Sequence, residues 1–282
     1  MSAPDLADLH MHSCHSDGVL TPAALMELVA ARGVTLAALT DHDTTAGLDD
    51  AATAAATHGV RFLRGVEVSA GWNGQSIHVI GLGVPPALAA SHPFEVHLAG
   101  IRARRVARLR EIGERLQRKA RIPGVTLADE VCAASAVPTR MHLARALVAA
   151  GHARDIGAAF DDFLSRRAPG HVPESWDDLA TTLAVLREAG ITAVLAHPHR
   201  YKLSSGALRR LLGEFRDGGG AAIEVCIGGM ARHDLDRLAT LARHFGFAAS
   251  TGSDFHDPAT PWNLPGRFDK LPAGLETVAA RF

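Results

Sequence analysis

The sequence predicts an α/β barrel of parallel strands that is interrupted by a helical insertion. Two observations support this prediction: short apolar or β-branched runs alternate with helical patterns, and one long central stretch contains no good strand. The expected strands cover residues 7–12, 35–41, 61–69, 77–83, 192–197, 221–227 and 247–252. A repeated strand-then-helix order of this length is typical of a parallel sheet or barrel.

Helices are expected between these strands. The first begins at Thr21-Pro22, a good pair for a helix cap and first turn, and ends near Gly33. A later one begins at Ser204 or Ser205, and another closes at Gly246. The expected helices of the barrel cover residues 21–33, 47–58, 176–189, 204–218 and 230–245.

The strand pattern stops between residues 85 and 172. This stretch indicates one long helix over 93–121, followed by shorter helices over 127–135, 139–150 and 154–167. We therefore expect three segments. They are residues 1–98 as the first part of the barrel, 99–171 as a helical insertion that binds substrate, and 172–282 as the second part of the barrel.

The bulk composition excludes several classes of protein. The 282 residues, of which 47% are hydrophobic, are enough for one large α/β domain and argue against disorder. A net charge of −1 provides no overall field for nucleic acid or an anionic membrane. Neither a DNA-binding domain nor a membrane partner is expected.

The cysteines and the first residues favour a cytoplasmic location. Cys14, Cys132 and Cys226 are widely spaced and form no CxxC pair, which argues against a disulfide framework or a thiolate zinc site. Residues 1–13 lack the basic and apolar regions of a signal peptide. No apolar run approaches the length of a transmembrane helix.

Nine residues able to bind metal recur along the chain, most of them where expected strands end. Parallel barrel strands bring their carboxyl ends to one face, so these side chains should meet in one pocket. Residues i and i+2 of a strand point the same way, so His10 and His12 can reach one ion. Asp254 and His256 repeat that spacing, and Glu67 is the best candidate for a carboxylate that bridges two ions. The nine residues are His10, His12, Asp17, His42, Glu67, His78, His197, Asp254 and His256.

Each of these residues also has a structural interpretation. A single His near a strand end is more often a core or surface residue, Asp17 precedes Gly18 and could form a turn, and Glu67 could pair with an arginine. The combination favours metal, because six of the seven expected strands end in His, Asp or Glu. Imidazole and carboxylate together suit Zn²⁺, Mn²⁺ or Fe²⁺.

The metal-binding motifs also resemble a known family. DLHMHSCHSDG, LTDHDT, GVEVS, IHVIGLG, LAHPHRY and GSDFH resemble, in order, the motifs of the PHP (polymerase and histidinol phosphatase) superfamily. The resemblance covers the barrel almost from end to end. It implies a distorted (β/α)7 barrel and two or three divalent ions, with Mn²⁺ expected and Fe²⁺ or Zn²⁺ as alternatives.

The resemblance also implies three sets of ligands. His10, His12, Glu67 and Asp254 would hold the first ion, and Glu67, His78 and His197 would hold the second. Asp17, His42 and His256 would hold the third. Some members of the family have a histidine where Asp17 stands, which leaves the occupancy and identity of the third ion open.

The helical insertion and its segment PTRMHLARALVAAG are similar to one PHP branch. That branch contains 3′,5′-nucleoside bisphosphate phosphatases and 5′→3′ exoribonucleases that act on short RNA. The resemblance implies a phosphoric monoester hydrolase that converts adenosine 3′,5′-bisphosphate to AMP and phosphate. Alternatives are the exoribonuclease, a histidinol phosphate phosphatase, and a non-catalytic PHP module, although nine usable side chains argue against the last.

Basic residues of the insertion are candidates for binding the phosphate that is not cleaved. Residues 101–121 contain nine basic side chains and two acids, a local charge of +7, and Arg104 and Arg108 share one helix face. A solvated basic face is the alternative. Arg140, His142 and Arg145 follow Pro138-Thr139 at the first turns of a helix, where anions bind favourably.

Residues beside the expected ions are candidates for catalysis. His199 is expected to contact phosphate or donate a proton, and Arg200 to contact phosphate, with a charged loop rim as the alternative. Asp254 is expected to be essential for turnover. Asp41 and Asp43 would orient imidazoles, while Glu224 would either do the same or contact the substrate ribose.

Overall fold

Seven strands form one sheet that curls into a nearly closed barrel, and each strand pairs with its neighbour in the chain. The computed structural model describes residues 6–282. Residues 1–5, part of the segment in which no signal peptide was expected, lie outside the described residues. All seven expected strands are present. They are β1 (Ala7–Asp8), β2 (Leu36–Leu39), β3 (Arg61–Trp72), β4 (Gln75–Leu82), β5 (Thr192–Leu195), β6 (Ala222–Ile227) and β7 (Ala248–Gly252).

The two ends of the sheet meet beside the candidate metal ligands. The backbone N–H of Leu9 donates to the carbonyl of Thr251 at 3.0 Å, and Met11 forms a parallel bridge with Phe255. This contact sets the first and last metal-binding motifs of the chain side by side.

The expectation that all strands are parallel is wrong for β4. This strand runs antiparallel to both β3 and β5, while the other pairs are parallel. Asn73 and Gly74 join β3 to β4 with φ values of 47° and 72°, as in the two-residue turns that form tight hairpins. Such a turn joins only antiparallel strands. His78 therefore lies in the first half of β4, and the reversal brings it to the face where the other strands end.

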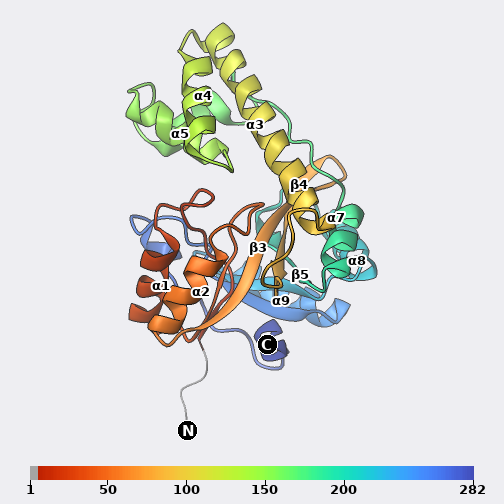
Figure 1. Cartoon of the computed structure of the whole chain (residues 1–282). Helices are drawn as coiled ribbons and strands as arrows, with labels where there is room; N and C mark the ends of the chain where they lie inside the picture. The colour runs from red at the N-terminus through yellow and green to blue at the C-terminus, as the bar shows by residue number, and fades with distance from the viewer. Residues whose placement is uncertain (1–5) are drawn as a thin grey trace.

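Helices surround the barrel on the outside (Figure 1). They match the expected helices apart from their ends. The helix that was expected to begin at Trp176 begins at Leu179 instead, because the side chain of Asp178 caps its first turn. The surrounding helices are α1 (Pro22–Ala31), α2 (Leu48–Thr57), α7 (Leu179–Glu188), α8 (Ser205–Asp217) and α9 (Arg232–Phe245). None of the helices within residues 6–282 combines the length and apolar composition that a membrane crossing needs.

The central stretch forms a helical lobe that stands above the barrel in Figure 1. Its last element is shorter than the helix expected over 154–167, because a single α-turn passes into a π-helix at Phe160–Leu164. The lobe consists of the far part of α3 (Pro93–Ala120), with α4 (Gly124–Ala134), α5 (Arg140–Ala149), α6 (Ile156–Ala159) and the π-helix.

The long helix α3 belongs to two hydrophobic clusters. Its first turns, through Ile101, pack into the core of the barrel. From Leu109 to Leu116 it packs into a separate cluster with α4 and α5. The change occurs within one continuous helix, so α3 connects the lobe to the barrel without a break. The segment boundaries at 98/99 and 171/172 stay predictions.

Candidate metal centre and substrate cavity

The first candidate site lies where β1 and β7 meet. The Nε2 atoms of His10 and His12 are 3.1 Å apart, and both lie 3.3 Å from Oε2 of Glu67. Oδ1 of Asp254 lies 3.3 Å and 3.4 Å from the same two nitrogens. Ligand atoms that share an ion at about 2.1 Å lie roughly 3.0–3.4 Å apart. The spacing therefore fits a cation held by these side chains.

Glu67 uses its other carboxylate oxygen for a second group. Oε1 lies 3.0 Å from Nδ1 of His78 and 3.0 Å from Nε2 of His197. Burial alone would raise the pKa of Glu67, but the imidazoles of His42 and His10 hold it well below its usual range. The carboxylate faces imidazoles with both oxygens, which is the arrangement expected of a bridging ligand.

Asp17 and three imidazoles form a third group, here called the Asp17 group (His12, Asp17, His42 and His256). Oδ1 of Asp17 lies 3.2 Å from Nε2 of His256 and 3.8 Å from Nε2 of His42. His42 also places its Nδ1 3.0 Å from Oε2 of Glu67. His42 therefore lies between Glu67 and the Asp17 group, whereas the family resemblance implies that His42 binds the third ion alone.

The chemistry of this buried cluster suits divalent cations. Three carboxylates and six imidazoles share the space, and all but His78 and His256 are at most 8% exposed. Within the described residues, Nδ1 of His197 is buried without a hydrogen-bond partner. Asp17 Oδ1 and the Nδ1 atoms of His42 and His78 lie close to other members of the cluster but form no hydrogen bond of acceptable geometry with them. Buried polar atoms normally have hydrogen-bond partners, so the chemistry of these atoms suits the binding of a cation.

Outer carboxylates hold the imidazoles in place. Nδ1 of His10 lies 2.9 Å from Oε1 of Glu224, whose Oε2 accepts the backbone N–H of His197 at 2.6 Å. Asp41 accepts hydrogen bonds from Ser13 and from Ser16, and the Ser16 hydroxyl lies 3.4 Å from Nδ1 of His12. Such partners fix the tautomer and orientation of metal-binding imidazoles.

The backbone is strained beside these ligands. Asp43, His197 and Asp254 have positive φ values of 50°, 29° and 53°. Residues other than glycine adopt this region at a cost, and structures retain such strain mainly at functional sites. Asp43 is held by Ser69, whose N–H and hydroxyl donate to its carboxylate at 2.7 and 2.9 Å.

A cavity of about 290 Å³ connects the cluster to the helical lobe. Asp17, His42 and His78 line its barrel side. The lobe side contains three arginines, one carboxylate and two aromatic rings. Those residues are Arg105, Arg108, Arg140, Glu174, Phe160 and Trp176, and the remaining lining residues are Ser76, Thr139 and Met141.

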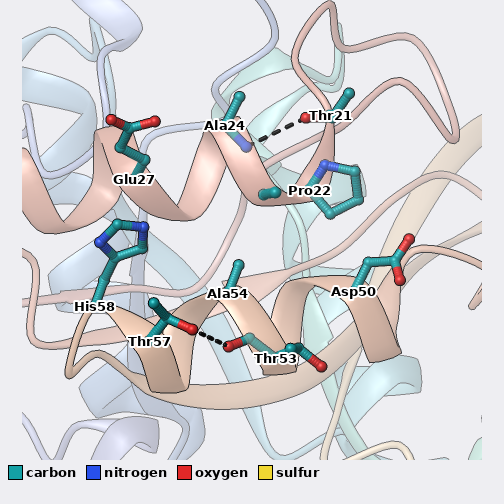
Figure 2. Close-up of a pocket in the computed structure, with 10 residues that line it drawn as sticks. Thr21, Pro22, Ala24, Glu27, Asp50, Thr53, Ala54, Thr57 and His58 are labelled. Atoms are coloured by element: carbon teal, nitrogen blue, oxygen red, sulfur yellow. Dashed lines mark hydrogen bonds between the residues drawn. The ribbon is translucent and has the colours of Figure 1, made fainter.

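A larger hollow of about 580 Å³ lies elsewhere, in the groove between α1 and α2 (Figure 2). Glu27 from α1 and His58 from the end of α2 stand at one end of this groove, and Thr21 and Asp50 lie toward the other. None of the nine candidate ligands lines it. Chemistry rather than size therefore places the candidate site in the smaller cavity.

Two of the expected phosphate-binding arginines line the cavity. Arg108 and Arg140 approach Glu174 at 3.3 and 3.1 Å, and Arg140 also lies over the ring of Phe160. Burial would raise the pKa of Glu174, but Arg140 and Arg108 lower it to about 2. Arg104 is not brought to the cavity, because its guanidinium pairs with Asp177 at 2.6 Å.

His142 and Arg145 face the loop that carries Asp17. Nδ1 of His142 accepts the backbone N–H of Thr139 at 3.1 Å and completes a capping box at the start of α5. Arg145 donates to the backbone carbonyl of Asp17 at 2.9 Å. Neither residue lines the cavity.

Arg200 and His199 lie on the turn after β5. Arg200 forms an ion pair with the carboxylate of Asp254 and does not line the cavity. Nδ1 of His199 is buried and has no hydrogen-bond partner within the described residues. Burial, followed by the charge of Arg200 and His197, lowers the pKa of His199 to about 4.

Seven cavity residues were not among the site candidates drawn from the sequence, and four of these carry a charge or an aromatic ring. Arg105 joins the barrel to the cavity, since its Nε lies 2.6 Å from Asp43 Oδ2 and its guanidinium lies over Trp176. Arg105 precedes Arg108 by three residues and so lies on the same helix face, a spacing from which its place in the cavity could have been predicted. Phe160, Glu174 and Trp176 come from irregular or π-helical segments, where no periodic pattern marks them.

Comparison with known proteins agrees with this geometry. Residues 8–109 match the PHP domain. A 3′,5′-nucleoside bisphosphate phosphatase from Chromobacterium violaceum is 39% identical over 265 residues, 94% of this chain and 92% of the relative. The 5′-3′ exoribonuclease Rnm of Salmonella typhimurium is 41% identical over 273 residues, 96% of this chain and 92% of the relative.

Solved structures share the whole fold. An amidohydrolase from Chromobacterium violaceum, with bound sulfate and no metal, superposes with a TM-score of 0.90 at 37% identity and covers 98% of this chain and 95% of its own. The similarity spans the barrel and the lobe together. The chain therefore belongs to the PHP superfamily, in the branch that contains these bisphosphate phosphatase and exoribonuclease relatives.

Proposed function

We propose that this protein is a metal-dependent phosphoesterase that removes the 3′-phosphate of nucleoside 3′,5′-bisphosphates, for example adenosine 3′,5′-bisphosphate. One observation supports this most directly. A single cavity is lined on one side by metal-cluster residues and on the other by Arg105, Arg108 and Arg140. A substrate with two phosphates can therefore place one at each side.

The proposed ligands follow the groups described above. His10, His12, Glu67 and Asp254 would hold one ion, Glu67, His78 and His197 a second, and Asp17, His42 and His256 a third, with Mn²⁺ as the proposed metal. Divalent ions in such a site activate water and offset negative charge on the phosphate. The buried carboxylates and imidazoles of the chain would hold these ions at fixed positions.

The lobe would bind the phosphate that is not cleaved. Arginine suits this task because its planar guanidinium donates paired hydrogen bonds to phosphate. Phe160 and Trp176 provide apolar walls for the nucleoside between the two ends. Binding the remote phosphate would orient the ester and favour bisphosphates over monophosphates.

Two residues near the ions have proposed catalytic roles. Asp254 would hold an ion while Arg200 neutralises its outer oxygen. His199 lies two residues after His197 on the turn after β5 and would contact phosphate or donate a proton from that turn, although its Nδ1 is buried and the residue does not line the cavity. Arg105, Arg108 and Arg140 line the cavity and are therefore the stronger candidates for phosphate binding than Arg200, His142, Arg145 and Arg104, which do not line it.

The second candidate function is 5′→3′ exoribonuclease activity on short RNA. The exoribonuclease relative at 41% identity supports it, and the same arginines would bind the 5′-phosphate. We further propose a reducing compartment, the cytoplasm, because Cys14, Cys132 and Cys226 are all free thiols.

Release of phosphate tests the proposal. The metal-free protein is supplied with Mn²⁺ and assayed on adenosine 3′,5′-bisphosphate, 3′-AMP, 5′-AMP and histidinol phosphate. Fast release from the bisphosphate alone supports the proposed substrate. Cleavage of 5′-phosphorylated di- to pentanucleotides, measured beside it, would favour the exoribonuclease, and preference for histidinol phosphate would overturn both.

A further inference from the structure

The loop over residues 13–18 carries Asp17 and is tied firmly to the barrel. Asp41 accepts the backbone N–H of Ser13 at 2.8 Å and the hydroxyls of Ser13 and Ser16 at 2.6 Å each. The loop folds back so closely that a Cβ on Gly18 would lie 2.3 Å from the carbonyl oxygen of His12. Only glycine tolerates that approach, so the loop has little freedom on its barrel side.

The helical lobe holds the same loop from the other side. Arg145 of α5 donates from Nη1 to the carbonyl oxygen of Asp17 at 2.9 Å. This contact is the reason to regard α5 as part of the support for Asp17.

The carboxylate of Asp17 depends on this support. Its Oδ1 lies 3.2 Å from Nε2 of His256 and is buried without a hydrogen-bond partner in the described part of the chain. The side chains that approach this oxygen within residues 6–282 are His256 and His42 of the same group, so the anchored backbone of Asp17 is the support that comes from outside the group. Outer partners of metal ligands typically change metal affinity by about 10–100-fold when they are lost.

We propose that Arg145 is a positioning residue through which the helical lobe supports the ion of the Asp17 group. The guanidinium faces a backbone carbonyl and does not line the substrate cavity, so this role is separate from phosphate binding. The competing interpretation is an ordinary contact between lobe and barrel, which would affect stability but not the binding of one particular ion.

Ion binding distinguishes the two interpretations. Metal-free protein is titrated with Mn²⁺ by isothermal calorimetry, and bound ions are counted by mass spectrometry, for the wild type, D17A, R145A, R145K and R154A. Arg154 is the matched control, because its side chain is 86% exposed and pairs only with its neighbour Asp155 in the described structure. No substrate is used, so the outcome does not depend on which phosphate ester is cleaved.

We expect D17A to lose one ion and R145A to bind that same ion about 10–100-fold more weakly, with the other ions unchanged. R145K should recover part of the loss because it keeps a charged donor, and R154A should match the wild type. The proposal would be overturned if R145A bound every ion with wild-type affinity or lost affinity equally for all of them. A full set of bound ions in D17A would overturn it as well. If R145A does not fold, R145Q is judged by the same criteria.

Discussion

Nδ1 of His10 lies 2.9 Å from Oε1 of Glu224, a residue 214 positions later in the chain. The second oxygen of Glu224 accepts the backbone N–H of His197, so one carboxylate holds ligands of two proposed ions. From the sequence, Glu224 was expected either to orient an imidazole or to contact the substrate ribose. Its contact with His10 favours the role of orienting an imidazole. Both side chains are fully buried, which excludes competition from water.

Glu224→Gln should weaken metal binding and activity by about 10–100-fold, because the amide keeps the shape but loses the charge that orients His10. Calorimetric titration with Mn²⁺ and the kcat/KM for phosphate release measure the effect. Glu276→Gln is the matched control, since that carboxylate is 65% exposed and pairs with Arg281 instead of a candidate ligand. Unchanged titration of Glu224→Gln would contradict the assigned role.

Glu67→Gln should reduce turnover more than Glu224→Gln does, by over about 100-fold. Both oxygens of Glu67 face imidazoles of different groups, and an amide nitrogen repels a cation at one of these positions. Phosphate release and the number of bound ions are measured together. A variant with full occupancy and activity within tenfold of the wild type would show that Glu67 does not bridge.

Arg140→Ala should raise KM for the bisphosphate by about 10-fold or more, as expected for loss of a hydrogen bond to a charged group. The KM for 3′-AMP should change much less, because that substrate lacks the second phosphate. Arg110→Ala is the control, as its side chain is 61% exposed on the same lobe. Equal effects on both substrates would place the 5′-phosphate elsewhere.

Acid should destabilise the ionic contacts around Glu174. Arg140 and Arg108 overcome the effect of burial and lower its pKa from 4.5 to about 2. A lowered pKa in the folded state contributes stability above pH 4.5, and this is lost as the pH falls toward 2. The difference in melting temperature between wild type and Glu174→Gln should therefore shrink over that range. A constant difference from pH 6 to pH 2 would argue against the ion pairs.

Removal of metal should abolish phosphate release and lower the melting temperature. Ions that bind only the folded state stabilise it by mass action, and without them the three buried carboxylates are left facing imidazoles and, for Asp254, Arg200. Dialysis against a chelator, followed by Mn²⁺, Fe²⁺ or Zn²⁺, tests both activity and stability. Activity that survives complete removal of metal would refute a metal-dependent mechanism.

The nine candidate ligands could be predicted from the sequence because their signals are local. His10 and His12, like Asp254 and His256, stand two residues apart at the end of a strand, and strand alternation points them the same way. The reversal of β4 also had a local signal, Asn73-Gly74 between apolar runs, which the expectation of parallel strands passed over. The surrounding helices followed from their apolar periodicity and capping residues.

The sequence by itself determined the barrel, the candidate metal-binding residues and the presence of a basic helical segment. Only the tertiary structure decided which arginines share a cavity with the candidate ligands: Arg105, Arg108 and Arg140 line it, whereas Arg104 pairs with Asp177. It also joined Glu224 to His10 and Arg145 to Asp17. The contacts of the arginines depend on how α3 carries the lobe over the barrel, whereas the contact between Glu224 and His10 depends on the meeting of the first and last strands of the sheet. No repeat or local spacing in the chain encodes such meetings between side chains that are far apart in the sequence.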